Sequence, residues 1–516
     1  MQSETTTKPL RKKDTRKLGK LRVQLSGLFP RIRDDRNEPR TVVIVPSLTL
    51  DEEVLSRISG VHHYEERLLC LLLLLRYPRT HVIYVTSTPI NEEIIDYYLH
   101  LLPGIPALHA RRRLTLISCD DASPKSLTAK LLERPRVLGR IREAIPDRHC
   151  AHLSCFTVTE LEARLSLKLE LPLYGCDPSL TTLGDKSGSR KLFRAAGLDL
   201  PDGAEDLETP DDVIEELAAL KERQPELRRA VVKINEGFSG EGNAVFHYDG
   251  APEDADKLRR WIRDRLPNLA YEAGEMSWAV FSGKLEAMGG IVEAFIEGEN
   301  KRSPSVQCRI DPIGSVDAMS THDQILGGAS GQIFLGARFP ADDEYRLEIQ
   351  EAGMKVAQLL GDKGVLGRFS IDFLSVRDES QPGNWKHYAI EINLRKGGTT
   401  HPFMMLQSLT DGAYDAATGH YLTRNGRPRY YHASDNLESE LYKGLLPYDL
   451  VDIAAMHQLN FHSTQQQGVV FHLMGALSEF GKLGVVCIGD SPERASEYYE
   501  ETVAILDKEG RAWQGL

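Results

Sequence analysis

An apolar strand that carries a single lysine runs directly into a glycine-rich turn at residues 230–243 (Ala-Val-Val-Lys-Ile-Asn-Glu-Gly-Phe-Ser-Gly-Glu-Gly-Asn). Successive side chains of a strand point to opposite faces, so Val232 and Ile234 can be buried while Lys233 points over the loop that follows. The pattern therefore predicts an ammonium group beside a loop of exposed backbone.

The glycine-rich turn is suited to hold an anion. Glycine can take positive φ, and without Cβ atoms the backbone N–H groups can converge on a phosphate. The residues that we expect to bind a nucleotide polyphosphate here are Lys233, Asn235, Gly237, Ser239, Gly240 and Gly242. A hairpin whose glycines serve only the turn is the alternative, because the pattern matches neither the P-loop nor the Rossmann fingerprint.

A second polar cluster lies on two short apolar runs, residues 370–374 and 388–393, which a polar segment separates as in a hairpin. If these strands pair, Asp372, Glu391 and Asn393 form one oxygen cluster. Such ligands suit Mg²⁺ when the ion also keeps waters and substrate phosphates. The alternative is a half-exposed hairpin with solvated acids.

The segment after this hairpin carries further candidates. Arg395 lies on the same side as Asn393 if the chain stays extended, and residues 396–402 (Lys-Gly-Gly-Thr-Thr-His-Pro) favour an exposed backbone. Within this run we expect His401 to take part in catalysis, although a lone histidine is more often structural.

Together, the lysine with its glycine-rich loop, the aspartate in an apolar strand and the Glu-x-Asn-x-Arg run resemble the ATP-grasp superfamily of carboxylate-activating ligases. The likeness covers roughly residues 180–410. Residues 391–402 further resemble the pheganomycin-type peptide ligases and a related domain of IQ-motif-containing protein H. The resemblance implies a mixed α/β (α+β) ATP-grasp fold with an N-terminal Rossmann-like pre-ATP-grasp domain and a small C-terminal domain.

The resemblance also implies roles for residues outside these motifs. Lys186 stands at the start of a segment that looks like the entry helix of the fold, whose lysine touches nucleotide phosphates. Residues 291–298 look like the hinge that binds adenine. The implied contacts are Glu293, Ala294 and Ile296 for the base, and either Glu299 or Asn300 for the ribose. A surface lysine at Lys186 and an edge-strand charge at Glu293 are the alternatives.

Strands and helices alternate from residue 41 onward, which favours a parallel sheet covered on its faces. The domains that we expect are a basic flexible arm (1–40), a pre-ATP-grasp α/β domain (41–180), the ATP-grasp catalytic lobes (181–410) and a C-terminal α+β domain (411–516). A final helix is predicted to begin at Ser491 and to end before Gly510.

Charge and cysteine content exclude several classes of protein. The net charge is −12, and because residues 1–40 carry +7, the rest carries −19, which argues against a nucleic-acid partner. Seven cysteines without CxxC spacing suggest neither a disulfide framework nor a zinc site, as expected in a reducing cytoplasm. The longest apolar run, residues 68–75, is too short to span a membrane, so we expect a cytoplasmic protein with a buried helix there.

The resemblance implies an ATP- and Mg²⁺-dependent carboxylate–amine (peptide) ligase that works through an acyl phosphate and releases ADP and phosphate. Mn²⁺ is an alternative metal, and the substrates would be a small-molecule carboxylate and amine, such as amino acids or peptides. Arg395, Lys233 and His401 are the expected catalytic residues. The alternatives are a non-catalytic or regulatory ATP-binding module and an ATP-grasp enzyme with another nucleophile. Many such proteins form homo-oligomers, so a homo-oligomer is one alternative for the oligomeric state of this protein.

Overall fold

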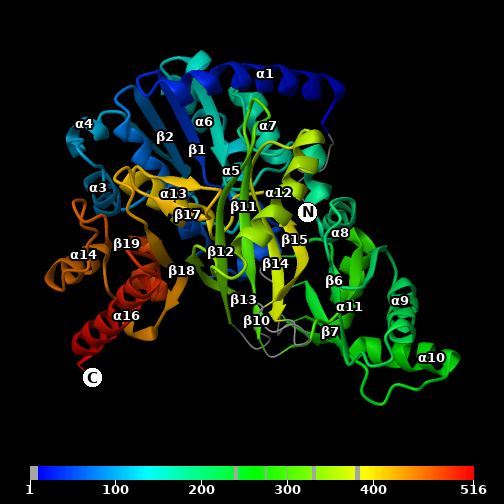
Figure 1. The fold of residues 1–516 in the computed structure, drawn as a ribbon. Coiled ribbons are helices and arrows are strands. Elements are labelled where there is room, and N and C mark those ends of the chain that lie inside the picture. Colours follow the sequence, from blue (N-terminus) through cyan, green and yellow to red (C-terminus); the bar gives the residue numbers. More distant parts are fainter. Residues whose placement is uncertain are drawn as a thin grey trace.

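The computed structural model describes residues 10–237, 242–272, 276–298, 300–327, 333–377 and 384–515. The expected contacts Ser239, Gly240 and Glu299 lie outside these ranges. Within them the chain builds sheets of four, five and nine strands and one small strand pair, with helices packed against the larger sheets (Figure 1).

The N-terminal region contains a parallel four-stranded sheet. In the order β3-β2-β1-β4, its strands are β1 (Arg40–Val45), β2 (Thr80–Thr86), β3 (Leu114–Ser118) and β4 (Ala151–Cys155). The helices of this region are α1 (Lys12–Asp34), α2 (Glu52–Arg57), the 3-10 helix η1 (Val61–Arg76), α3 (Glu92–His100), α4 (Ala107–Arg111), α5 (Leu127–Leu132), α6 (Pro135–Glu143) and α7 (Glu160–Leu169). Alternate residues of β1 enter two different cores, so the sheet is buried on both faces as the alternating pattern predicts.

Helix α1 corrects the expectation of a flexible arm. Leu25, Leu28 and Phe29, at helical spacing, are buried, and Arg22 donates a 2.6 Å hydrogen bond to the carbonyl of Gly364. The basic residues of this stretch cover the outer face of an amphipathic helix, because an apolar stripe three and four residues apart anchors the inner face.

A five-stranded antiparallel sheet forms a smaller lobe. In the order β5-β9-β6-β7-β8, its strands are β5 (Gly203–Leu207), β6 (Arg229–Ile234), β7 (Asn243–His247), β8 (Ala270–Tyr271) and β9 (Gly290–Ala294). The helices beside it are α8 (Lys186–Ala195), α9 (Pro210–Arg223), α10 (Ala255–Arg265) and α11 (Trp278–Met288). This lobe has a core of its own, formed by buried residues between 207 and 294.

The nine-stranded sheet carries the predicted carboxylate hairpin. Its strands are β10 (Lys301–Arg302), β11 (Pro304–Ile310), β12 (Val316–Gly327), β13 (Ile333–Phe339), β14 (Gly367–Arg377), β15 (Trp385–Asn393), β18 (Tyr430–Glu438), β19 (Gly468–His472) and β20 (Lys482–Gly489). They follow the order β10-β14-β11-β12-β13-β18-β20-β19, with β15 paired to β14. Strands β18, β19 and β20, which follow residue 410, thus extend the sheet that carries this hairpin.

Helix α12 (Arg346–Asp362) packs against β11 and β12 of this sheet. The elements that follow the hairpin are α13 (Thr400–Thr410), β16 (Ala413–Asp415), β17 (His420–Leu422), α14 (Pro447–Met456), α15 (Leu477–Phe480) and α16 (Pro492–Gln514). Helix α16 starts after the predicted cap Ser491 but continues through Gly510, so its predicted end is wrong. A Cβ at Gly510 would lie 2.5 Å from the carbonyl oxygen of Leu441, which indicates that this glycine serves close packing rather than helix termination.

The leucine-rich η1 is buried, and it packs with α13 and the C-terminal strands in one apolar core. Within the described ranges, no helix combines the length and the apolar character that a membrane crossing requires.

Candidate active site

A cleft of about 1220 Å³ receives residues from all the regions above. The sequence-predicted residues that line it are Lys186, Lys233, Gly237, Gly242, Glu293, Ala294, Ile296, Asp372, Glu391, Asn393 and Arg395. Strands β6 and β9 of the smaller lobe supply one wall, and the β14–β15 hairpin supplies another.

The hairpin forms the predicted oxygen cluster. Asp372 on β14 lies opposite Glu391 on β15, and the amide of Asn393 donates a 3.0 Å hydrogen bond to Asp372. Burial, together with the charge of Glu391, raises the pKa of Asp372 to about 7. Two facing carboxylates at such a position are costly without a cation, so this donor set fits Mg²⁺.

The oxygen cluster of Asp372, Glu391 and Asn393 is small. Among the described residues, no group of three or more histidine, cysteine, aspartate or glutamate side chains is placed to hold a metal. Two carboxylates and one amide leave coordination positions for water and substrate phosphates, which is the usual manner of Mg²⁺ binding.

Two cations flank this cluster. The ammonium of Lys186, at the start of α8, lies 3.8 Å from a carboxylate oxygen of Glu391. Burial lowers the pKa of Arg395, although the charges of Glu391 and Asp372 oppose that effect. The positive groups are therefore held where a phosphate bound beside the carboxylates would meet them.

Glu293 on β9 holds Lys233 rather than presenting a free carboxylate. One of its oxygens lies 2.6 Å from the Lys233 ammonium, and the other accepts a 2.5 Å hydrogen bond from Arg190. Burial disfavours the ionised form, but the two cations outweigh it and lower the pKa of Glu293. This arrangement fixes the Lys233 ammonium at the cleft wall.

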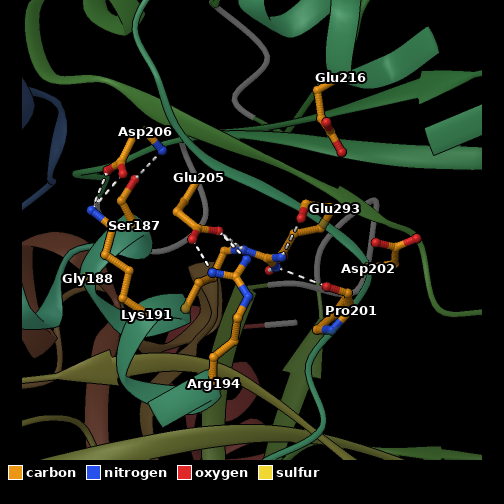
Figure 2. Close-up of polar contacts among 12 residues, drawn as sticks. Ser187, Gly188, Lys191, Arg194, Pro201, Asp202, Glu205, Asp206, Glu216 and Glu293 are labelled. Carbon is orange, nitrogen blue, oxygen red and sulfur yellow. Dashed lines mark hydrogen bonds and ion pairs between the residues drawn. The ribbon is translucent and has the colours of Figure 1, made fainter. Parts of the chain in front are cut away.

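Arg190, on α8, lies outside the described lining of the cleft but supports its wall, a role that the sequence reasoning missed. Besides Glu293, its guanidinium donates to Glu205 at 3.1 Å and to the carbonyls of Pro201 and Gly203, both at 3.0 Å. Figure 2 labels three of these partners, Pro201, Glu205 and Glu293. The position of Arg190 four residues after Lys186, on one face of the same helix, is the signal that would have marked it.

Arg190→Met should lower the free energy of unfolding by about 3 kcal/mol, because it removes one partner of a buried ion pair and leaves Glu293 with incomplete compensation. Urea denaturation measures the change. Arg194→Met is the matched control, since Arg194 binds the same Glu205 but is 46% exposed; it should cost no more than about 1 kcal/mol. Equal losses in the two variants would contradict a special role for the buried pair.

The two described glycines of the loop bring its ends together. A Cβ on Gly237 would lie 3.1 Å from the backbone nitrogen of Gly242, and one on Gly242 would lie 2.5 Å from Cγ1 of Ile234. Larger residues would force this turn apart, so the glycines serve close backbone approach.

Asn235 has a supporting position. Its side-chain oxygen accepts from the backbone and hydroxyl of Ser187, and its amide donates to the carbonyl of Met288 at 3.0 Å. The residue is not among the described residues that line the cleft. It ties the loop to α8 and α11 instead of contacting the cleft.

The hinge residues line the cleft but several of their backbone groups are already bonded. The Ala294 N–H donates to the carbonyl of Asp202 at 2.7 Å, and the Ile296 carbonyl accepts from Lys301 at 2.6 Å. Asn300 is exposed and lies outside the described lining of the cleft. Base and ribose contacts for these residues stay predictions.

The structure does not bring His401 to the cleft. Its side chain is buried, and its Nε2 lies 3.3 Å from Nε2 of His472 on β19. Helix α13 begins at Thr400, after the half-buried Gly397 and Gly398 and the cap Thr399, and its start turns His401 into the core. A catalytic role for His401 is therefore not supported.

The cleft also contains residues that no local motif marks. Asp323 and Gln324 belong to β12, and a hydrogen bond from Gln324 lowers the pKa of Asp372 against the effect of burial. Farther along, the lining includes Arg57, Tyr64, Arg67, Asp435, Lys443 and Lys482. These six come from the N-terminal and C-terminal regions, so only the folded chain assembles them.

Comparisons with known proteins show the family of the chain. A family model described as IQCH-like, ATP-grasp matches residues 179–252 and 255–417, and a PGM1 C-terminal domain model matches residues 449–502. An L-propargylglycine–L-glutamate ligase of Streptantibioticus cattleyicolor is 30% identical over 473 residues, which cover 90% of this chain and 94% of that protein. IQ motif-containing protein H of Danio rerio is 26% identical over 424 residues, 73% of this chain and 40% of that protein.

Solved structures share the fold. A biotin carboxylase of Campylobacter jejuni, in a beta-gamma-ATP complex, has a TM-score of 0.54 at 12% identity and covers 92% of this chain and 95% of its own. The biotin carboxylase domain of Hydrogenobacter thermophilus 2-oxoglutarate carboxylase, with MgADP, has a TM-score of 0.54 at 13% identity, over 90% of this chain and 89% of its own. Since a relative 30% identical spans nearly the whole chain, the protein belongs to the ATP-grasp family of ligases.

Proposed function

We propose that this protein joins the carboxylate of one small amino acid or peptide to the amine of another, using Mg²⁺-ATP and an acyl-phosphate intermediate. The observation that carries the proposal is the Asp372, Glu391 and Asn393 cluster, with Lys186 3.8 Å from Glu391 and Arg395 beside it in one cleft. The name of the S. cattleyicolor relative, a ligase for two amino acids, supports amino-acid substrates.

A carboxylate needs activation because its leaving group would otherwise be oxide. Attack by a carboxylate oxygen on the γ-phosphorus breaks the bond to ADP and gives an acyl phosphate. The amine nitrogen then attacks the acyl carbon, loses a proton, and phosphate departs. Little covalent chemistry is asked of the protein, whose work is positioning and charge neutralisation.

Each cleft residue has a part in this scheme. Lys186 and Lys233 would bind phosphate oxygens, and Arg395 would stabilise the acyl phosphate and the tetrahedral oxyanion. Asp372, Glu391 and Asn393 would hold Mg²⁺, which supplies charge neutralisation for the ATP phosphates when bound. The fixed Lys233–Glu293 contact at 2.6 Å would keep one ammonium oriented before the nucleotide arrives.

Product analysis tests this function. The full chain, Mg²⁺-ATP and a panel of L-amino acids that includes L-glutamate should give ADP and phosphate only when both a carboxylate and an amine are present. Hydroxylamine should trap the acyl phosphate as a hydroxamate, and EDTA should stop turnover. AMP and pyrophosphate would overturn the mechanism, and ATP binding without turnover across the panel would favour a regulatory ATP-binding module.

A further inference from the structure

The cleft extends beyond Arg395 into a part of the molecule to which the ligase chemistry assigns no role. There η1 supplies Arg67, and β18 supplies Asp435. Figure 1 places β18 and β6, the strand of Lys233, on opposite sides of β12 and β14. This end of the cleft therefore lies away from the residues expected to hold the nucleotide.

Arg67 is held rigidly at this end. Its Nη2 donates a 2.6 Å hydrogen bond to Asp435, and the two side chains are only 12% and 6% exposed. The guanidinium carbon lies 4.3 Å from the centre of the Tyr64 ring, so the planar group has an aromatic support. A fixed orientation reduces the entropy lost when a ligand binds.

Much of the hydrogen-bonding capacity of Arg67 is unused. A guanidinium has five N–H donors, and within the described residues Arg67 makes a single side-chain bond, from Nη2 to Asp435. Its Nε is enclosed, so the donors left for a ligand are those of Nη1 and the second hydrogen of Nη2. Unfilled donors in a fixed fork match a carboxylate, which accepts two parallel hydrogen bonds. The surrounding charges agree: Arg57, Lys443 and Lys482 line the cleft together with Arg67, against the acids Asp435 and Glu438.

We infer that Arg67, held by Asp435 and supported by Tyr64, binds the non-reacting carboxylate of an amino-acid substrate. This inference rests on the proposed function, because the reacting group would lie at Arg395 and the metal cluster. Arg67 and Arg395 line the same cleft. A small substrate that has its reacting group at Arg395 and a carboxylate at Arg67 is an amino acid in which that carboxylate takes no part in the reaction.

Equilibrium binding tests the inference without turnover. Calorimetry with the full chain, Mg²⁺ and a non-hydrolysable ATP analogue measures the affinity for L-glutamate against L-isoglutamine, and for L-alanine against L-alaninamide. The wild type should prefer at least one free acid over its α-carboxamide by about 10- to 100-fold, the range expected for a charge-assisted bidentate contact. The pair that shows the preference identifies which substrate Arg67 holds.

Arg67→Gln should remove that preference, and Arg67→Lys should keep part of it, while the affinity for the ATP analogue changes less than about twofold. Arg309→Gln is the matched control, since Arg309 makes a 2.7 Å pair with Asp317 and lies outside the described lining of the cleft; it should keep the full preference. Equal binding of acid and amide by the wild type, or a parallel loss of nucleotide and amino-acid affinity in Arg67→Gln, would overturn the inference. Preference without ADP formation would instead count only against the ligase function.

Discussion

Glu391→Gln should reduce kcat by about 1000-fold or more while the nucleotide still binds with weakened affinity, because the variant loses one of the two charges that a metal requires here. Glutamine keeps the size of the side chain and one oxygen, but it cannot balance a divalent cation together with Asp372 alone. Lys186, 3.8 Å from Glu391, would also lose its carboxylate neighbour. ADP release at saturating ATP measures kcat, and calorimetry with an ATP analogue measures binding.

A surface carboxylate supplies the control for this variant. Glu344 pairs with Arg377 at 2.6 Å and lies outside the described lining of the cleft, so Glu344→Gln should keep kcat within about twofold. Raising the Mg²⁺ concentration should not restore Glu391→Gln, since the metal would bind in a weaker and altered site. Near-normal turnover in Glu391→Gln would contradict the proposal that Glu391 is a ligand of Mg²⁺.

The parts of the site that the sequence could predict are those set by local pattern. Asp372 and Glu391 fall on two short strands with a period of two, which predicts that a hairpin can gather the acids. The observed register pairs them directly, through a register shift between Asp372 and Phe373 that the sequence did not indicate. The lysine on β6 likewise follows from its place between buried valine and isoleucine residues. The family resemblance added Lys186, which no periodicity marked.

Other parts depend on distant segments and could not be predicted. Arg67 and Asp435 meet across 368 residues, and neither lies in a motif. The basic residues at the start of the chain indicated a solvated arm, yet three apolar residues decide that α1 packs. His401 looked functional because its neighbours did, and only the start of α13 shows that it turns inward. Such outcomes depend on the surface that each element buries against distant parts of the chain. Composition and local spacing do not specify that choice.

Arg395→Met should lower kcat by about 100- to 1000-fold with little change in ATP affinity, because a group that acts on developing charge contributes mainly in the transition state. Arg395 is half-buried beside two carboxylates, and desolvation together with the charge of Arg67 lowers its pKa against the effect of Glu391 and Asp372. A residue used only for packing would not need a charge at this position. Rapid-quench measurement of acyl-phosphate formation, followed as hydroxamate, separates the first chemical step from product release.

Two further variants decide between charge and shape at this position. Arg395→Lys keeps the positive charge without the planar fork, and it should recover part of kcat but not the full rate. Arg377→Met removes an exposed arginine that pairs with Glu344, and it should leave both steps unchanged. If Arg395→Met raised KM for ATP and left kcat intact, Arg395 would contribute to binding of the ground-state nucleotide instead. The lysines of the cleft would then be the groups that stabilise the oxyanion.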